Sequence, residues 1–306
     1  MTPAGGGVPS PAALAWRTAR RSLTLDRAAV VVGILNVTPD SFSDGGLHFQ
    51  AAAAVAAARA MRDAGADIID VGGESTRPGA RQPQEAEELR RVIQVIEQIA
   101  GLGVPISVDT RRASVAQAAL GAGAEIVNDV SALAHDPAMA AVVAAAGAGL
   151  ILMHMRGTPE TMDQHARYGD VVAEVCAELG ARRDAAVAAG ITPQAIVLDP
   201  GLGFAKRSEH NLTLIDQVPR LAALGHPVLL GPSRKRFLGD LTGKAAPDRD
   251  AATAAACVAG RLRGAHLFRV HDVASAREAL NVADAVLGAG DVLSVPPSPR
   301  PPVPRL

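Results

Sequence analysis

One pattern recurs along most of this sequence: a short run rich in Val and Ile ends in a polar residue, and an Ala-rich or amphipathic stretch of helical length follows. The pattern predicts a strand followed by a helix, and it occurs eight times. No Asn-Gly hairpin signal separates the units, so the strands are expected to run parallel. The expected strands are 30–36, 67–71, 104–108, 125–128, 149–153, 195–199, 227–231 and 265–270.

Eight parallel βα units favour an α/β fold of the (β/α)₈ TIM-barrel type, because eight is the number of strands at which such a sheet closes around a filled core. The same periodicity also fits an open, doubly wound sheet, which stays the alternative. A chain of 306 residues that is 48% hydrophobic can bury one large core, so a single domain is expected.

The stretch after the second expected strand illustrates the helical pattern. Its apolar residues recur three or four positions apart and are Leu89, Val92, Ile93, Ile96 and Ile99. The charged residues expected mostly on the opposite face are Glu87, Glu88, Arg90 and Arg91. This helix is therefore expected to cover the sheet with its apolar face.

The two ends of the chain differ in composition from the barrel, which is expected over 28–290. Residues 1–27 are expected to form a partly disordered N-terminal extension, in which 12–27 add a short hairpin across the bottom of the barrel. Residues 291–306 are rich in Pro and Arg and predict a disordered tail.

Charge and cysteine content narrow the partners and the compartment. The formal net charge is -1, from 30 basic and 31 acidic residues, so neither nucleic acid nor an anionic membrane is an expected partner. Only Cys176 and Cys257 are present, too few for a disulfide framework, which predicts a cytoplasmic protein. The first apolar run, 28–37, is too short for a membrane span and is interpreted as a strand.

Polar side chains end every expected strand, although a parallel strand buried on both faces should be almost wholly apolar. A single Asp in such a place is commonly a helix cap or a turn residue. A whole set is different, because the carboxyl ends of barrel strands meet at one rim, the usual place of an active site. The residues expected at this rim are Asn36, Asp70, Asp109, Asn128, Asp129, His154, Asp199, Ser233, Arg234, Lys235, Arg269 and His271.

The expected rim contains two kinds of chemistry. Carboxylates and an amide suit the edge of a nitrogen heterocycle, and they are Asp70, Asp109, Asn128 and Asp199. Cationic side chains suit a phosphate group, and they are Lys235, Arg269 and His271, with Arg77 from a nearby loop. An oxygen ligand such as Asn36 beside a diphosphate would suit Mg²⁺. The substrate is therefore expected to carry both a heterocycle and an anion.

Two other classes of site are disfavoured. The run Gly201-Leu202-Gly203-Phe204-Ala205-Lys206 begins like a dinucleotide fingerprint, but Lys206 takes the sixth position and no Walker pair follows. No Ser or Cys stands in a nucleophile-elbow context, so covalent catalysis is not expected.

Eight ordered motifs within about residues 30–290 resemble the dihydropteroate synthase family, and several are long enough to be nearly specific to it. They are GILNVTPDSFSDGG at 33–46, DIIDVGGESTRPGA at 67–80, ISVDT at 106–110, IVND at 126–129, LMHMRG at 152–157, LDPGLGF at 198–204, GPSRK at 231–235 and RVHDV at 269–273. Members of that family look like (β/α)₈ barrels. One departure is Ala205, where a Gly is common.

The resemblance implies a transferase of a pterinylmethyl group. Its substrates would be 6-hydroxymethyl-7,8-dihydropterin diphosphate and 4-aminobenzoate, and its products 7,8-dihydropteroate and diphosphate. It also implies Mg²⁺ as cofactor, competition by sulfonamides as mimics of 4-aminobenzoate, and a homodimer.

By the same resemblance, each substrate part has its own contacts. The pterin would contact Asp70, Asp109, Asn128, Met153, Asp199, Phe204, Gly231 and Lys235. The diphosphate would meet Asn36, Thr76, Arg77, Arg269 and His271, with Mg²⁺ bound by Asn36. The 4-aminobenzoate would lie against Phe42, Pro78, Phe204 and Ser233. The residues expected to carry the reaction are Asp40, Arg77, Lys235, Arg269 and His271.

Two other functions stay open as alternatives. A related pterin-binding barrel that passes a methyl group to a corrinoid shares the acidic pocket but needs no diphosphate site, so the cationic segments 233–235 and 269–271 argue against it. A catalytically silent paralogue would bind pterin without turnover, and it would have no need of the loop sequences PDSFSDGG and ESTRPGA.

Overall fold

The main sheet of the computed structural model, which describes residues 14–25, 28–37, 47–74 and 83–293, has eight parallel strands. Their order is β8-β7-β6-β5-β4-β3-β10-β9. A parallel bridge between Leu198 and Val228 joins the two end strands, and the N–H of Leu198 donates to the carbonyl of Pro227. The sheet therefore closes on itself, which confirms the barrel and excludes the open, doubly wound alternative.

All eight predicted strands are present, with ends that differ by a few residues. They are β3 (Val30–Asn36), β4 (Ile68–Gly72), β5 (Ile106–Asp109), β6 (Ile126–Asp129), β7 (Gly149–Met153), β8 (Ile196–Asp199), β9 (Leu229–Leu230) and β10 (Leu267–Val270). Each strand is followed along the chain by at least one helix, so the connections are of the βα type that parallel pairing requires.

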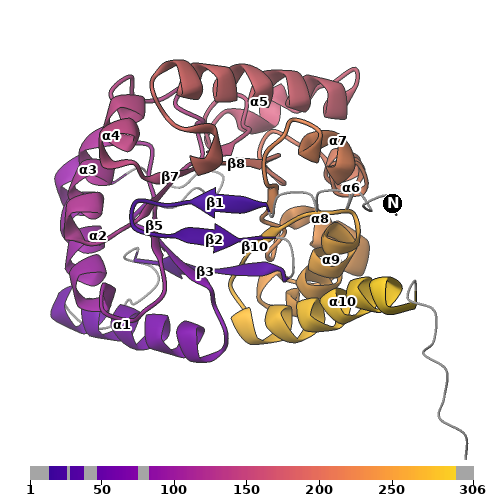
Figure 1. Ribbon diagram of the computed structural model, residues 1–306, viewed down its shortest axis with the longest axis horizontal. Helices are drawn as coiled ribbons and strands as arrows, with labels where there is room; N and C mark the ends of the chain where they lie inside the picture. Colours follow the sequence, from indigo (N-terminus) through magenta and orange to yellow (C-terminus); the bar gives the residue numbers. More distant parts are fainter. Residues whose placement is uncertain (1–13, 26–27, 38–46, 75–82, 294–306) are drawn as a thin grey trace, which may run out of the picture.

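Helices surround the barrel on its outside, as Figure 1 shows. They are α1 (Leu47–Asp63), α2 (Glu85–Ile99), α3 (Ala113–Ala122), α4 (Met139–Ala146), α5 (Val171–Ala188), α6 (Ser208–Asp216), α7 (Val218–Ala222), α8 (Arg236–Thr242), α9 (Asp250–Leu262) and α10 (Val273–Leu293). Short 3₁₀ helices lie at Met162–His165, Pro193–Ala195 and Ala246–Asp248. Among the described residues, no helix combines the length and the apolar composition that a bilayer span needs.

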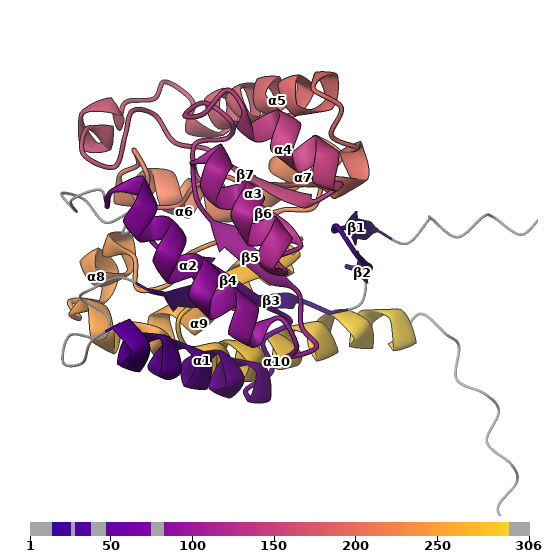
Figure 2. The same cartoon turned by 90° about the vertical axis from the view of Figure 1, so that its left-hand side faces the viewer.

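A hairpin closes one end of the barrel. The strands β1 (Ala15–Arg17) and β2 (Ser22–Thr24) pair antiparallel, as expected for this segment, and Figure 2 shows them beyond the end of the main sheet. The indole N–H of the fully buried Trp16 donates to the carbonyl of Ala195 at 2.8 Å. Trp16 therefore packs into the bottom of the barrel interior, together with Val30, Val32, Ile68, Ile126, Ile151, Val197, Leu229 and Leu267.

The prediction for the face of α2 is wrong at Glu88. This side chain is fully buried, and its carboxylate accepts a hydrogen bond from the hydroxyl of Thr110 at 2.7 Å and pairs with Arg112. A buried carboxylate is tolerated where partners are supplied, and hydrophobic spacing alone does not reveal such partners. The other fully buried positions of the helix are Val92, Val95, Ile96 and Ile99, while Leu89 and Ile93 are only partly buried.

Candidate active site

The polar residues at the carboxyl ends face the barrel interior because side chains alternate along a strand. In four strands, an apolar residue of the interior core stands two positions before a predicted site residue, and both therefore point inward. These pairs are Ile68 and Asp70, Ile126 and Asn128, Val197 and Asp199, and Leu267 and Arg269. The site residues therefore form the next layer of inward-facing side chains, towards the carboxyl ends of the strands.

Arg269 connects two of the acids. Its Nε lies 2.6 Å from Oδ2 of Asp70, and its Nη2 lies 2.7 Å from Oδ2 of Asp109. The side-chain amide of Asn128 donates to the same oxygen of Asp70 at 3.1 Å. The other oxygen of Asp70, Oδ1, is buried and has no hydrogen-bond partner within the described residues. Three predicted pterin residues and one predicted diphosphate residue thus form one cluster.

Asp199, Phe204 and Lys235 form the neighbouring part of the site. The backbone N–H of Gly201 donates to Oδ1 of Asp199 at 2.7 Å, which fixes the carboxylate at the start of the turn after β8. The ammonium of Lys235 lies 3.9 Å from the centre of the Phe204 ring, a cation–π contact. Phe204 also packs with Met153 in a small buried cluster, and Met153 lies beside Asp199 in the sheet register.

The charges of this cluster are strongly perturbed. Burial raises the pKa of Asp109 to about 7, although the Arg269 guanidinium opposes the shift. Burial also raises the pKa of Asp199 to about 6, against the N–H of Gly201 and the charge of Lys235. Burial lowers the pKa of Lys235 to about 8, and Asp199 opposes this change. Perturbed groups collected in one pocket are typical of a functional site.

Ser233 and His271 meet at the next strand ends. The hydroxyl of Ser233 accepts a hydrogen bond from the backbone N–H of His271 at 3.1 Å and lies 2.9 Å from its Nδ1. Arg234, by contrast, does not join the expected cationic set, because it pairs with Asp250 at the start of α9. A Cβ added to Gly231 would stand 3.9 Å from Cβ of Arg269, so this glycine lies beside the base of the Arg269 side chain.

Asp129 has a structural role. Its carboxylate accepts hydrogen bonds from the N–H groups of Ser131 and Leu133, both at 2.8 Å, and from the hydroxyl of Ser131 at 2.6 Å. This is the turn function that a single Asp at a strand end commonly has. Asn128, its neighbour in sequence, points to the opposite face and into the site.

Five predicted site residues lie outside the described residues: Asp40, Phe42, Thr76, Arg77 and Pro78. Asn36 lies within them, at the end of β3, and is partly exposed. Among the described residues, no group of three or more His, Cys, Asp or Glu side chains is arranged to hold a metal ion.

Sequence reasoning missed two groups of buried charges beside the pocket. Arg111 pairs with Glu74 at the ends of β5 and β4, and both side chains are buried. Lys206 lies against His154 on the far side of the turn after β8. In the sequence, Arg111 stands directly after a strand-end motif and Lys206 directly after a Gly-rich turn. These positions were the available signals that both residues lie near the site.

The fold and the cluster define a class of protein: a barrel enzyme whose pocket offers carboxylates and an amide to a heterocycle, with cations beside them. The sequence model of the family described as "Pterin binding enzyme" matches residues 32–271. The chain therefore belongs to the pterin-binding enzymes, and the relatives reported below place it in their dihydropteroate synthase family.

One such relative is the dihydropteroate synthase of Mycobacterium leprae, which is 51% identical over 267 residues, covering 85% of this chain and 94% of the relative. Among solved structures, the dihydropteroate synthase of Xanthomonas albilineans with 4-aminobenzoic acid has a TM-score of 0.84 and 47% identity, covering 90% of this chain and 98% of that one. The same enzyme in complex with 7,8-dihydropteroate has a TM-score of 0.81 and 45% identity, covering 89% of this chain and 98% of that one.

Proposed function

We propose that this protein condenses 6-hydroxymethyl-7,8-dihydropterin diphosphate with 4-aminobenzoate, giving 7,8-dihydropteroate and diphosphate in folate biosynthesis. The observation that carries the proposal is the single cluster in which Asp70, Asp109 and Asn128 meet Arg269. A heterocycle and an anionic leaving group can be held there at the same time. The Xanthomonas albilineans enzyme, solved separately with 4-aminobenzoic acid and with 7,8-dihydropteroate, supports the same substrate and product.

The pterin is proposed to lie between the acids. The free oxygens of Asp109 and Asp199 accept from the N–H groups of the ring edge, and the amide of Asn128 can both donate and accept. The buried Oδ1 of Asp70, which has no hydrogen-bond partner within the described residues, is a further acceptor. Lys235 approaches the ring from the side of Phe204, with Met153 and Gly231 completing the walls.

The diphosphate is proposed to lie at Arg269 and His271, joined by Thr76 and Arg77. Asn36 would bind Mg²⁺, because its amide oxygen is the kind of ligand that this ion takes and its partial exposure leaves room for water and phosphate oxygens. In the sheet register Asn36 lies beside Gly72, and Gly72 beside Asp109, so the amide is next to the acidic cluster. When bound, Mg²⁺ would help to neutralise the charge of the diphosphate.

The reaction is proposed to start with departure of the diphosphate. The C–O bond to the methylene carbon breaks and its electron pair leaves with the diphosphate, where the charges of Arg269 and His271 stabilise it. The electron-rich pterin ring stabilises the methylene cation, with Asp40 proposed as its charge partner. The amine of 4-aminobenzoate then forms the new C–N bond and loses a proton. Ser233 and Phe204, with Phe42 and Pro78, are proposed to hold the aminobenzoate.

We also propose a cytoplasmic homodimer. Large apolar side chains are exposed on α9 and α10, namely Leu262, Val282, Val286 and Leu287. These two helices pack against each other, so their outer faces offer one apolar surface to a second copy. The cytoplasm is proposed because both cysteines, Cys176 and Cys257, are free.

Incubation of the protein with pterin diphosphate, 4-aminobenzoate and Mg²⁺ tests the proposed function. We expect 7,8-dihydropteroate, detected by mass spectrometry, and its formation should require both substrates. A sulfonamide should raise the KM for 4-aminobenzoate and leave the maximal rate unchanged. Binding of pterin without any coupled product would contradict the proposal and favour the silent paralogue, while methyl transfer from a methylated pterin to a corrinoid would favour the other alternative.

The affinity for a pterin without diphosphate is expected to fall as the pH is lowered from 8 to 5. Asp109 and Asp199 accept hydrogen bonds best when ionised, and burial raises their pKa values to about 7 and about 6. Protonation through this window should therefore weaken binding progressively. Calorimetric titration across the pH range checks this result, and an affinity that stays constant down to pH 5 would show that neither carboxylate contacts the ring as an anion.

A further inference from the structure

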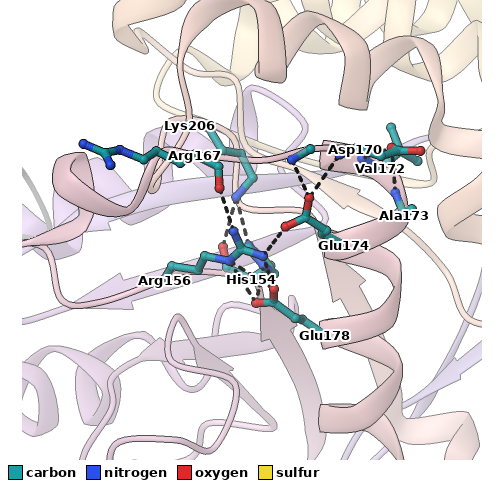
Figure 3. A network of polar contacts seen from close by, with 10 residues as sticks. His154, Arg156, Arg167, Asp170, Val172, Ala173, Glu174, Glu178 and Lys206 are labelled. Carbon is teal, nitrogen blue, oxygen red and sulfur yellow. Dashed lines mark hydrogen bonds and ion pairs between the residues drawn. The ribbon is translucent and has the colours of Figure 1, made fainter.

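Lys206 is a buried lysine that the proposed chemistry does not use. Its ammonium lies 3.0 Å from Nδ1 of His154 and donates to the carbonyl of Phe204 at 2.9 Å, as Figure 3 shows for the His154 contact. Only 8% of the residue is exposed. A lysine almost never loses its water without compensating partners, so this arrangement needs a structural or functional reason.

The contact with His154 belongs to a longer chain of hydrogen bonds. While Lys206 is protonated its ammonium can only donate, so Nδ1 of His154 accepts and the ring proton resides on Nε2. That nitrogen lies 3.0 Å from Oε2 of Glu178, on α5, to which it donates. Glu178 also pairs with Arg156, which in turn pairs with Glu174 (Figure 3). Contacts that begin at Glu178 on α5 and pass through His154 therefore fix the position of Lys206.

The turn after β8 rests on the same histidine. The backbone N–H of His154 donates to the carbonyl of Asp199 at 2.9 Å. A Cβ added to Gly201 would stand 2.0 Å from the carbonyl oxygen of His154, so the two backbones are in direct contact. His154 therefore supports the turn at its beginning, and through Lys206 it supports the turn at Phe204.

The turn needs such support because Ala205 has a φ of 51°, in the left-handed region. This conformation costs an L-residue other than Gly about 1 kcal/mol. Ala205 is fully buried and precedes Lys206 directly. The hydrogen bond from Lys206 to the backbone carbonyl of Phe204 spans this strained residue, and the ring of Phe204 meets Lys235.

We propose that Lys206 is a positioning residue for pterin binding, which holds the turn 200–205 and keeps Asp199 and Phe204 in place. This proposal rests on the proposed function and extends it to a residue that does not touch the substrate. Lys206 is buried, and its hydrogen bonds go to His154 and Phe204.

Lys206 also acts on the site through its charge. The charged groups around it are Asp199 and Lys235 on the pocket side and Glu178 and Arg156 on the helix side, with the ring of His154 between. Burial lowers the pKa of Lys206 to about 7, and Asp199 is the main group that opposes this. In return the charge of Lys206 is one of those that lower the pKa of Asp199. Loss of this charge should make Asp199 harder to ionise.

The substitution Lys206→Met tests the proposal, because it keeps an unbranched side chain and removes the charge and the hydrogen bonds. The KM for pterin diphosphate should rise about tenfold, as expected for a lost charge-assisted contact, while the KM for 4-aminobenzoate changes less than about twofold. The pH at which the affinity for a bare pterin falls on acidification should rise by about half a unit. Lys244→Met is the matched control, since Lys244 is exposed and its side chain contacts none of these groups.

A folded Lys206→Met variant with an unchanged KM for pterin diphosphate and an unchanged pH dependence of bare-pterin binding would overturn the proposal. An affinity loss that is equal at every pH would also overturn it, because that result indicates only a disturbed fold. If Lys206→Met does not fold, Glu178→Ala decides, since this partly exposed residue connects the buried His154 to Arg156. It should raise the pterin KM about threefold through weaker fixation of His154 and Lys206, and no change would contradict the proposal.

These measurements separate the proposal from the function on which it rests. Binding of a bare pterin can be titrated even if the wild-type protein forms no dihydropteroate. A wild-type protein without turnover, in which Lys206→Met still weakens pterin binding, would refute only the proposed function. Normal turnover in both proteins, with the same KM for pterin diphosphate, would refute only the role of Lys206.

Discussion

Replacing Arg269 by Ala is expected to lower turnover about 1000-fold, the size of loss seen when a group that stabilises a leaving charge is removed. Arg269 is proposed to act on both parts of the substrate, since it bonds Asp70 and Asp109 and belongs to the strand that leads to His271. Its removal should also raise the pKa of Asp109 further, because the guanidinium is the main group that opposes the effect of burial there. Steady-state kinetics with pterin diphosphate provides the measurement.

The same variant should be less stable by about 3 kcal/mol at pH 8, because it leaves buried carboxylates without their cation. The deficit should shrink as the pH falls, since protonation neutralises Asp109, whose pKa is raised by burial. Denaturant unfolding at pH 8 and pH 5.5 checks this. Arg263→Ala is the control, because its pair with Asp216 is exposed. Equal stability losses for Arg269→Ala at both pH values, or turnover within about tenfold of wild type, would contradict the role given to Arg269.

Replacing Asp199 by Asn is expected to weaken pterin binding about 100-fold, or about 3 kcal/mol. The N–H of Gly201 already occupies Oδ1, so an Asn would turn its oxygen to that N–H and its NH₂ towards the ring edge. Two donors would then face each other. Calorimetric titration with a bare pterin measures the loss, and Asp216→Asn at an exposed position is the control.

The melting temperature separates this effect from misfolding. Burial disfavours the ionised form of Asp199, so a neutral Asn of the same shape should leave the fold as stable at pH 7 as before. Wild-type affinity in Asp199→Asn would remove Asp199 from the pterin site. A large fall in melting temperature would instead show that the charge of Asp199 mainly stabilises the fold.

Hydrophobic periodicity was sufficient to predict eight buried parallel strands, and the bridge between Leu198 and Val228 then decided between a closed barrel and an open sheet. The same alternation explains why the predicted site residues meet: Asp70, Asn128 and Asp199 each follow an inward-facing core residue by two positions. Their roles towards substrate stay predictions, since contact with a ligand is a property of the complex.

Other features depend on contacts between distant parts of the chain. Arg234 stands between Ser233 and Lys235 in sequence, but a φ of 55° turns this segment and places Arg234 against Asp250. Glu88 is charged and yet fully buried, because Thr110 and Arg112 from the next unit bind it. Lys206 follows a Gly-rich turn, but its partner His154 lies after β7 and is held by Glu178 on α5. A pattern within one segment of the sequence cannot predict a contact with a residue in another segment.

A crystal structure of the wild-type protein with a bound pterin tests the central claim most directly, namely that the strand ends grip the heterocycle together. We expect the ring edge to lie within hydrogen-bond distance of Asp109, Asn128 and Asp199, with Lys235 beside the ring. A pterin bound elsewhere, or one that contacts a single strand end while the other acids keep their present partners, would contradict it.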